Sequence, residues 1–242
     1  MQTEINKLRK LLEKEKINVN NDFYNNLLVY TGLLLETNKS LNLTAITEPS
    51  QIIIKHYFDS LYPLKYNLIK PAHKVIDVGC GAGFPSIILR MAQAASFTLM
   101  DASKKRLAFL DEVIAKLALN ETVTLHMRAE DAGRDKQFRQ QYDIAVSRAV
   151  ASLEILCEYC LPLLNIGGSL IAYKGDITDG ELESGKEAAI QMGGSIKNIY
   201  RYDLPYNMGK RSIIIINKVS DTPEKYPRSA KKIKQIKNNV EK

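Results

Sequence analysis

Three glycines that alternate along the segment Val75–Pro85 form the part of this sequence most typical of a ligand-binding loop. Gly79, Gly81 and Gly83 follow an apolar run, and Pro85 can begin a helix. Glycine allows backbone angles that a side chain would forbid, and it lets a flat ligand approach the main chain. A loop between a strand and a helix lies at the sheet edge where open α/β sheets bind ligands. The segment therefore predicts a binding site.

Two further features point to an adenosine group in that site. Asp101 ends the next apolar run, and a carboxylate there can accept hydrogen bonds from both hydroxyls of a ribose. Ala129 and Glu130 follow the third run, where a backbone amide and a carboxylate can bind the edge of an adenine ring. Because these features fall at the ends of three successive predicted strands, we expect them to converge on one nucleoside.

The glycine spacing separates two classes of cofactor. The dinucleotide fingerprint G-x-G-x-x-G directs a helix N-terminus at a pyrophosphate, whereas this loop reads G-x-G-x-G. Asp77 lies two positions before the loop, and its carboxylate would repel a pyrophosphate. S-adenosylmethionine carries an ammonium and a sulfonium instead, which an acidic group attracts. We therefore predict S-adenosylmethionine rather than NAD as the cofactor, and a methyltransferase rather than an oxidoreductase.

The elements that must position these residues alternate from residue 71 onward. Short apolar and β-branched runs predict strands at 75–78, 97–100, 123–126, 142–146, 169–172 and 213–216. Helical spacing predicts helices at 85–93, 103–118, 152–164 and 179–192. This alternation indicates an α/β fold with a mostly parallel sheet and helices on both faces. We divide the chain into an N-terminal helical region (1–70), a methyltransferase domain (71–219) and a basic C-terminal tail (220–242).

The net charge of +7 is concentrated at the C-terminal end of the chain. Residues 210–242 hold ten Lys or Arg and three Asp or Glu, while the charges of residues 1–209 balance. A basic tail releases counterions when it binds phosphates, which favours a nucleic-acid partner, although a solubilising tail would have the same composition. From Asp221 onward the polar composition predicts poor order.

The number of cysteines and the lengths of the apolar segments indicate in which cellular compartment the protein acts. Three cysteines are too few for a disulfide framework, and Cys157 and Cys160 are interpreted as buried apolar residues on a predicted helix. A metal site would need further ligands, and none of the three histidines has a partner histidine at metal-ligand spacing, so we expect no metal. The first residues lack the apolar core of a signal peptide, and no stretch approaches the roughly 20 apolar residues of a membrane span. We expect a cytoplasmic monomer with no membrane partner.

Five short segments carry a resemblance to a known family: Asn42–Ile46, Lys55–Leu61, Asp77–Pro85, Ser147–Ala149 and Lys174–Gly175. Together they resemble the bacterial small-subunit rRNA guanine methyltransferases, once named glucose-inhibited division protein B. The glycine loop alone indicates only a class I, Rossmann-like methyltransferase, and the other segments are more specific. The similarity runs from about residue 38 to about residue 218. Two small residues depart from it, a cysteine at 80 in place of threonine and a serine at 86 in place of glycine.

The resemblance implies a seven-stranded sheet, a ribosomal RNA or small-subunit partner, and methyl transfer to ring nitrogen seven of a guanine in 16S rRNA. It also implies cofactor contacts at Gly79, Phe84, Ala129, Glu130 and Arg148. The predicted cofactor-binding residues are therefore Asp77, Gly79, Gly81, Gly83, Phe84, Asp101, Ala129, Glu130 and Arg148. The predicted substrate-binding residues are Asn42, Thr44, His56, Asp59 and Lys174.

Structural roles compete for each of the five substrate-binding candidates. Asn42 and Thr44 could instead cap a helix. His56 and Asp59, about one helical turn apart, could hold the helical region against the sheet. Lys174 could be an ordinary solvated lysine.

Arg148 is the predicted catalytic residue, because its planar fork can bind a carboxylate, a base or a phosphate; a surface ion pair is the alternative. Nitrogen seven of guanine carries an exposed lone pair and needs no general base. Catalysis then rests on positioning, which can contribute roughly 7–11 kcal/mol. Three alternatives stay open: methylation of another RNA, methylation of a protein or small molecule, and a nucleic-acid-binding module with a degenerate cofactor fold.

Overall fold

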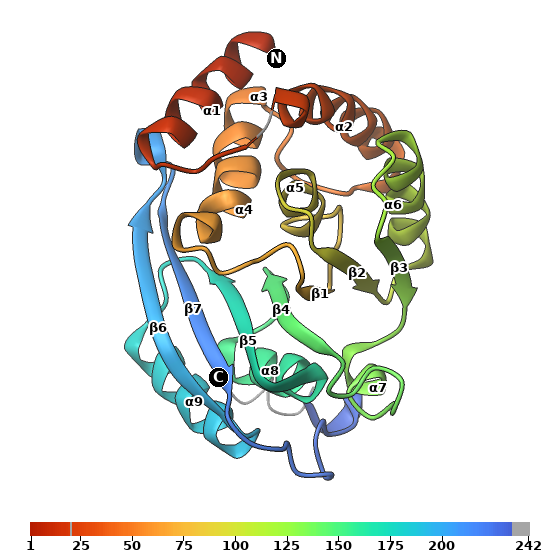
Figure 1. Cartoon of the computed structure of the whole chain (residues 1–242), viewed down its shortest axis with the longest axis vertical. Coiled ribbons are helices and arrows are strands. Elements are labelled where there is room, and N and C mark those ends of the chain that lie inside the picture. The colour runs from red at the N-terminus through yellow and green to blue at the C-terminus, as the bar shows by residue number, and fades with distance from the viewer. Residues whose placement is uncertain (20, 234–242) are drawn as a thin grey trace.

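A computed structural model describes residues 1–19 and 21–233, and a single twisted sheet lies at its centre (Figure 1). The strands run in the order β3-β2-β1-β4-β5-β7-β6. Strands β1 to β5 are parallel, and β7 pairs antiparallel with both β5 and β6. Their bounds are β1 Lys74–Val78, β2 Ser96–Asp101, β3 Thr122–His126, β4 Tyr142–Arg148, β5 Leu164–Lys174, β6 Gly194–Asp203 and β7 Lys210–Lys218.

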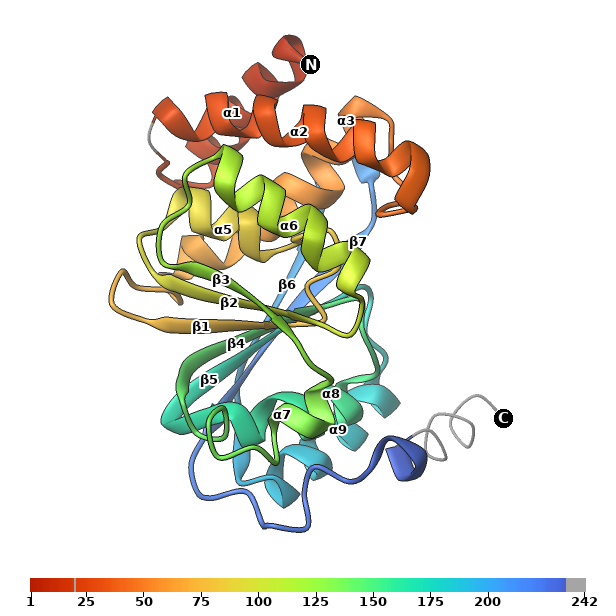
Figure 2. The ribbon, with the colours of Figure 1, turned by 90° about the vertical axis from the view of Figure 1, so that its right-hand side faces the viewer.

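Helices cover both faces of the sheet (Figure 2). One layer holds α1 Gln2–Lys14, α2 Asn21–Leu41, α3 Pro49–Gln51, the π-helix η1 Ile52–Phe58, α4 Asp59–Leu61, the 3₁₀ helix η2 Tyr62–Tyr66, α5 Ser86–Ala92 and α6 Lys104–Lys116. The other holds α7 Ala129–Ala132, α8 Leu153–Cys160, the 3₁₀ turn η3 Leu161–Leu163 and α9 Asp179–Gln191. The short 3₁₀ turn η4 Pro205–Asn207 lies between β6 and β7. The predicted α/β class, with a mostly parallel sheet covered on both faces, is confirmed.

Local sequence explains where the helices that flank the site begin. The Ser103 side chain accepts a hydrogen bond from the Arg106 N–H at the start of α6. Thr178 does the same for the Glu181 N–H at the start of α9. Such caps satisfy N–H groups that have no partner within the helix. Helix α2 ends before Asn42, which takes a left-handed conformation (φ 49°) that asparagine tolerates better than most residues.

The N-terminal helices share a core with the sheet. Phe23, Leu27 and Tyr30 of α2 are buried in the same apolar cluster as Ile87 of α5 and Leu110 of α6. A second cluster fills the space between the other sheet face and α8 and α9. Residues 1–70 thus bury their apolar face against residues of the sheet domain. The boundary at residue 70 stays a prediction.

Strand β6 is the strand of the sheet that the sequence did not locate. It lies at the edge of the sheet, and Gly194 is its only buried residue. The pairing register with β7 shifts between Ile196 and Asn198, which interrupts the apolar alternation that marks a strand. An exposed, irregular edge strand therefore carries little periodic signal.

The expectation of poor order from Asp221 onward is wrong for the first part of the tail. Residues 221–228, here called the C-terminal strap, pack against α7 and α8, with Tyr226 buried. Arg139 donates hydrogen bonds to the carbonyls of Thr222 and Tyr226. The Arg228 guanidinium binds the buried Glu158 carboxylate at 2.5 Å. Residues 234–242, the end of the predicted basic tail, lie outside the described residues.

Candidate active site

Three adjoining hollows lie along the carboxyl ends of the parallel strands, where ligands bind in open α/β sheets. The first, the α7 hollow, has a volume of about 180 Å³. It is lined by Val78, Gly79, Met100, Asp101, Ala102, Met127, Arg128, Ala129, Glu130, Val150 and Tyr159. Asp101, Ala129 and Glu130, which the sequence placed at one adenosine, thus line one cavity.

The second hollow surrounds the glycine loop and has a volume of about 400 Å³. It is lined by Leu43, Thr44, His56, Gly79, Cys80, Gly81, Ala82, Phe84, Asp101, Arg106, Arg148, Ala149 and Val150. We call it the glycine-loop hollow. It shares Gly79, Asp101 and Val150 with the α7 hollow, so the two lie next to each other.

The third hollow, about 390 Å³, lies on the far side of Arg148 and is called the η1 hollow. Its lining is Ile46, Lys55, His56, Asp59, Arg148, Ala149, Tyr173, Lys174, Gly175 and Arg211. His56, Arg148 and Ala149 belong to both this hollow and the glycine-loop hollow. Arg148 therefore stands between a space lined by the glycine loop and a space lined by several cations.

The main chain of the glycine loop requires glycine for two different reasons. Gly79 has a positive φ of 78°, and a Cβ there would lie 2.6 Å from a methyl of Val150. At Gly81, also at positive φ, a Cβ would meet nothing closer than 4.0 Å. The space above Gly81 is therefore open to a ligand, and a side chain would fill it. Gly83 lies away from the hollows, and a Cβ there would clash with Ile87 of α5.

Asp101 is held in place by the loop that it faces. One carboxylate oxygen accepts the Gly81 N–H at 3.0 Å, and the other accepts the Ser103 N–H at 2.8 Å. Each oxygen keeps a further acceptor position. The carboxylate lies at the junction of the first two hollows, where it can receive the two hydroxyls of a ribose.

Asp77 lies beneath the loop rather than in a hollow. Its side chain is fully buried, and the groups of Ser86 near it do not reach good hydrogen-bond geometry. Burial raises the pKa of this carboxyl to about 7, although Ser86 and the Arg148 charge oppose that rise. A buried carboxylate with such weak partners is costly. A cationic ligand above the loop would stabilise it, and an adenosine bearing an ammonium and a sulfonium therefore fits this site.

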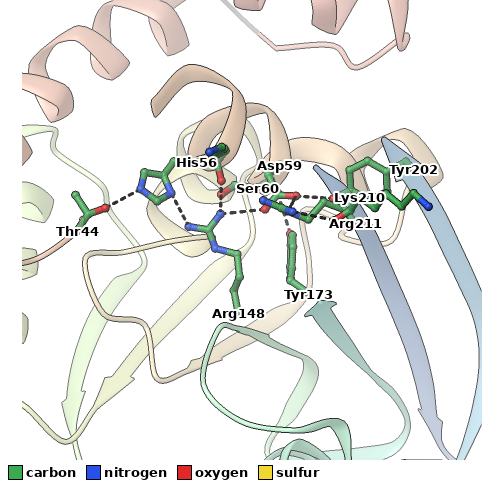
Figure 3. Close-up of polar contacts among 10 residues, drawn as sticks. Thr44, His56, Asp59, Ser60, Arg148, Tyr173, Tyr202, Lys210 and Arg211 are labelled. Carbon is green, nitrogen blue, oxygen red and sulfur yellow. Dashed lines mark hydrogen bonds and ion pairs between the residues drawn. The ribbon is translucent and has the colours of Figure 1, made fainter. Parts of the chain in front are cut away.

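Arg148, at the end of β4, is fixed by three groups of the π-helix region (Figure 3). Its Nη1 donates to the Lys55 carbonyl at 3.1 Å and to Asp59 Oδ2 at 3.2 Å. Its Nη2 lies 3.1 Å from His56 Nδ1. The guanidinium also lies over the Phe84 ring, 5.1 Å from its centroid. Residues predicted separately as cofactor-binding and substrate-binding thus meet in one network.

His56 is an uncharged member of this network and lies between Arg148 and Thr44. Its ring stacks on Phe84 with the centroids 4.1 Å apart. Burial, together with the charge of Arg148, lowers the pKa of His56 to about 3. The ring is therefore uncharged at neutral pH and supplies hydrogen bonds without a proton for transfer.

Two residues that the sequence did not single out complete the Asp59 site. Tyr202 donates a hydrogen bond to Asp59 Oδ1 at 2.7 Å, and the Arg211 Nε lies 3.6 Å from the same oxygen. Tyr202 of β6 pairs with Arg211 of β7 across the sheet edge. Because β6 was not predicted, the pairing of Tyr202 with Arg211 could not be predicted either. The weak alternation of apolar residues over 194–203 is the signal that could have indicated this strand.

Two predicted substrate-binding residues, Asn42 and Lys174, are not part of the Arg148 network. Asn42 is exposed at the end of α2 and lines none of the three hollows. Lys174 lines the η1 hollow, but its Nζ lies 2.6 Å from Glu181 and donates to the Ala151 carbonyl. Lys174 thus has an ordinary structural role, and Asn42 lies outside the hollows.

Two findings bear on metals and membranes. Within the described part of the chain, no three His, Cys, Asp or Glu side chains are grouped as a metal site would need. Cys157 and Cys160 are buried and unpaired by disulfide, in apolar surroundings. None of the helices in residues 1–19 and 21–233 combines the length and apolar character of a membrane span.

Comparison with known proteins relates the chain to both a fold and a family. It is similar to the YcgJ protein of Bacillus subtilis (TM-score 0.53, 11% identity, 68% of this chain and 100% of that one). It is also similar to M. jannaschii TYW2, solved in complex with AdoMet (TM-score 0.50, 15% identity, 61% and 68%).

Sequence similarity is much closer to named ribosomal RNA enzymes. The chain is 46% identical over 207 residues to "Ribosomal RNA small subunit methyltransferase G" of Thermoanaerobacter sp. (strain X514), covering 85% of this chain and 86% of that protein. The family model described as rRNA small subunit methyltransferase G matches residues 23–204, which include the glycine loop, Arg148 and its partners Lys55, His56 and Asp59. The chain belongs to the rRNA small subunit methyltransferase G family.

Proposed function

We propose that this protein transfers the methyl group of S-adenosylmethionine to ring nitrogen seven of a guanine in 16S ribosomal RNA. The observation that carries the proposal is the row of three adjoining hollows at the carboxyl edge of the sheet. Two have the features of an adenosine and amino-acid site, and the third is open and cationic. Family membership supports ribosomal RNA as the substrate.

The proposed cofactor placement follows the polarity of the lining residues. Ala129 and Glu130 would contact the adenine, Asp101 would receive the ribose hydroxyls, and the amino-acid end would lie against Gly79 and Gly81. Phe84 and Arg148 would close the side that faces the substrate. The bound cofactor supplies an electrophilic methyl group on a cationic sulfur.

The side chains near the proposed transfer point orient groups and do not take a proton. Nitrogen seven of guanine has a free lone pair, so no general base is required. The neutral His56 is consistent with this, because a pKa of about 3 removes it as a base at neutral pH. Catalysis would come from holding the base in line with the methyl group, to which correct geometry contributes roughly 7–11 kcal/mol.

The η1 hollow is the proposed entry for the target base. Cationic side chains gather around it and around the adjoining hollow of about 230 Å³ near the end of the β6–β7 hairpin. They are Lys55, Arg148, Lys174, Arg201, Lys210 and Arg211, against the acids Asp59, Asp176 and Asp203. An excess of positive charge at the opening attracts phosphates. The protein would act in the cytoplasm on RNA or the small subunit, as a monomer and without a metal.

Two measurements test this proposal. Calorimetric titration of the purified protein should detect binding of S-adenosylmethionine and no binding of NAD. Mass-spectrometric mapping of small-subunit rRNA should then show one 7-methylguanosine that disappears from cells lacking this protein. Binding of NAD alone would refute the cofactor, and an unchanged guanine methylation map would refute the substrate.

A further inference from the structure

Thr44, on the segment between α2 and α3, lines the glycine-loop hollow, and its side chain points toward His56 (Figure 3). Its main chain is held by a reciprocal pair of hydrogen bonds with Asn38. The Thr44 N–H donates to Asn38 Oδ1 at 2.8 Å, and the Asn38 amide donates to the Thr44 carbonyl at 3.0 Å. The position of the hydroxyl is thus set by the end of α2.

The hydrogen bonds of His56 fix which of its nitrogens carries the proton. Arg148 Nη2 lies 3.1 Å from His56 Nδ1, and a guanidinium can only donate. His56 Nδ1 must therefore accept. A neutral imidazole has a single N–H, which is then on Nε2. Because Nε2 lies 2.9 Å from Thr44 Oγ1, that N–H donates to the threonine oxygen.

The same oxygen receives a second hydrogen bond. The Ile46 N–H donates to Thr44 Oγ1 at 3.0 Å. A hydroxyl oxygen has two acceptor positions, and both are now used. The hydroxyl proton is left over, and no acceptor within the described ranges of the chain receives it. Thr44 therefore offers the hollow one hydroxyl that can donate and can no longer accept.

A group that only donates discriminates between the two charged ends of an amino acid. An α-carboxylate accepts such a bond, whereas an ammonium needs an acceptor. Arg148 is less available for this role because Lys55, Asp59 and His56 already bind both of its terminal nitrogens. In the proposed cofactor placement, the amino-acid end lies beside Gly79 and Gly81, in the hollow that Thr44 lines.

We propose that the Thr44 hydroxyl donates a hydrogen bond to the α-carboxylate of the methyl donor, held in that orientation by His56 and Ile46. This assignment rests on the proposed function. It makes Thr44, which the sequence had assigned to the RNA substrate, a residue that binds the cofactor. It also gives His56 a positioning role, in which one tautomer connects Arg148 to Thr44.

The test compares two adenosine compounds that differ in the amino-acid end. S-adenosylhomocysteine carries the α-carboxylate, and 5′-methylthioadenosine lacks the amino-acid portion. Calorimetric affinities for both are measured with the wild type, with Thr44→Val, which removes the hydroxyl, and with Thr44→Ser, which keeps it. Thr44→Val should weaken S-adenosylhomocysteine by about tenfold, as expected for one hydrogen bond to a charged group, and change 5′-methylthioadenosine by less than about twofold. Thr44→Ser should retain most of the wild-type affinity for both.

Each other outcome counts against a different statement. Equal weakening of both compounds by Thr44→Val would mean that Thr44 only supports the fold of the hollow, which overturns the proposal. Unchanged affinity for S-adenosylhomocysteine would overturn it as well. A wild-type protein that binds neither compound would refute the proposed function itself. Nitrogen NMR of His56 provides a second readout, with a protonated Nε2 and an unprotonated Nδ1 expected at neutral pH.

Discussion

At the level of single residues, Arg148 connects the two sides of the proposed reaction. Its guanidinium is held by His56, by Asp59 and by the Lys55 carbonyl, and it lies over Phe84. These contacts hold the side chain in one orientation. Fixed donors and charges of this kind lose little energy to reorganisation during a reaction.

Replacement of Arg148 should reduce methyl transfer while the protein stays folded. Both Arg148→Ala and Arg148→Lys should lower kcat by about 100-fold, because a lysine ammonium cannot reproduce a planar fork that binds three groups. Asp59 would keep its contacts with Tyr202 and Arg211, so the fold should persist. Steady-state kinetics and far-UV circular dichroism check the two parts. Full activity in Arg148→Lys would remove the fork geometry from the mechanism.

Replacement of Asp77 by asparagine should increase the stability of the protein and weaken its binding of the cofactor. Its pKa is raised to about 7 in the folded protein by burial, against about 4 when unfolded. Because folding raises this pKa, the contribution of Asp77 to the free energy of unfolding is fully present below about pH 4, the pKa in the unfolded chain. That contribution is lost as the pH rises through about 7. Asp77→Asn should therefore be more stable than the wild type at pH 8, by at most about 4 kcal/mol, and less so at pH 5.

Urea unfolding at both pH values measures this difference without ligand. The same variant should bind S-adenosylmethionine more weakly than the wild type, because the negative charge beneath the loop is gone. A stability difference that is the same at pH 5 and pH 8 would show that Asp77 does not titrate in this range.

Residues with local signals could be predicted from the sequence, and residues that depend on distant partners could not. The glycine loop, Asp101 and Glu130 are marked by their place at the ends of predicted strands. The link between His56 and Arg148 joins positions 92 residues apart, and only the fold brings them together. The resemblance named both residues, but it gave no reason for their contact.

Among the elements, η1 determines how the helical layer meets the sheet. The sequence predicts His56 and Asp59 on one face of an α-helix, whereas the structure has a π-helix over Ile52–Phe58. A π-helix is rare and often occurs at functional sites. Here it presents the Lys55 carbonyl and His56 to Arg148, and Asp59, the first residue of the following α4, binds the same arginine. No spacing of apolar residues distinguishes it from an α-helix.

The C-terminal strap is the second element that the sequence did not predict as ordered. Its polar composition conceals contacts that are made by distant groups: Glu158 of α8 and Arg139 of the loop before β4. Pro227 also packs where a Cβ on Gly133 would lie, at the end of α7. Composition alone cannot reveal partners of this kind.

Removal of the buried strap ion pair should cost more than removal of a surface one. Glu158 is 1% exposed, so Arg228→Ala leaves a buried carboxylate without its cation and should lower the free energy of unfolding by about 1–3 kcal/mol. The matched control is Lys186→Ala, whose pair with Glu183 is exposed and should contribute less than about 0.5 kcal/mol. Urea midpoints at constant m-value measure both.

The double variant Arg228→Ala with Glu158→Gln provides a further check. Removing the charge of the carboxyl should recover part of the lost stability, because the unpaired anion causes much of the cost. Equal losses for Arg228→Ala and Lys186→Ala would show that the strap contact contributes no more than a surface pair.

At the scale of the whole molecule, the glycine-loop and η1 hollows lie where the N-terminal helical layer meets the sheet. Tyr30 of α2 donates a hydrogen bond to the Ala82 carbonyl in the glycine loop at 2.6 Å. Thr44 and His56 reach the same hollow from that layer, and Arg148 reaches it from β4. The class of fold was readable from the alternation of strands and helices, but this junction required the tertiary structure.

The most direct measurement of the central claim is methyl transfer by the purified protein to a defined RNA. Methyl-labelled S-adenosylmethionine is incubated with small-subunit RNA from cells that lack this protein, and the RNA is digested to nucleosides for mass spectrometry. The account expects the label in 7-methylguanosine at one position, with wild type and far less with Arg148→Ala. Label on any other atom, or none with a wild-type protein that binds the cofactor, would contradict it.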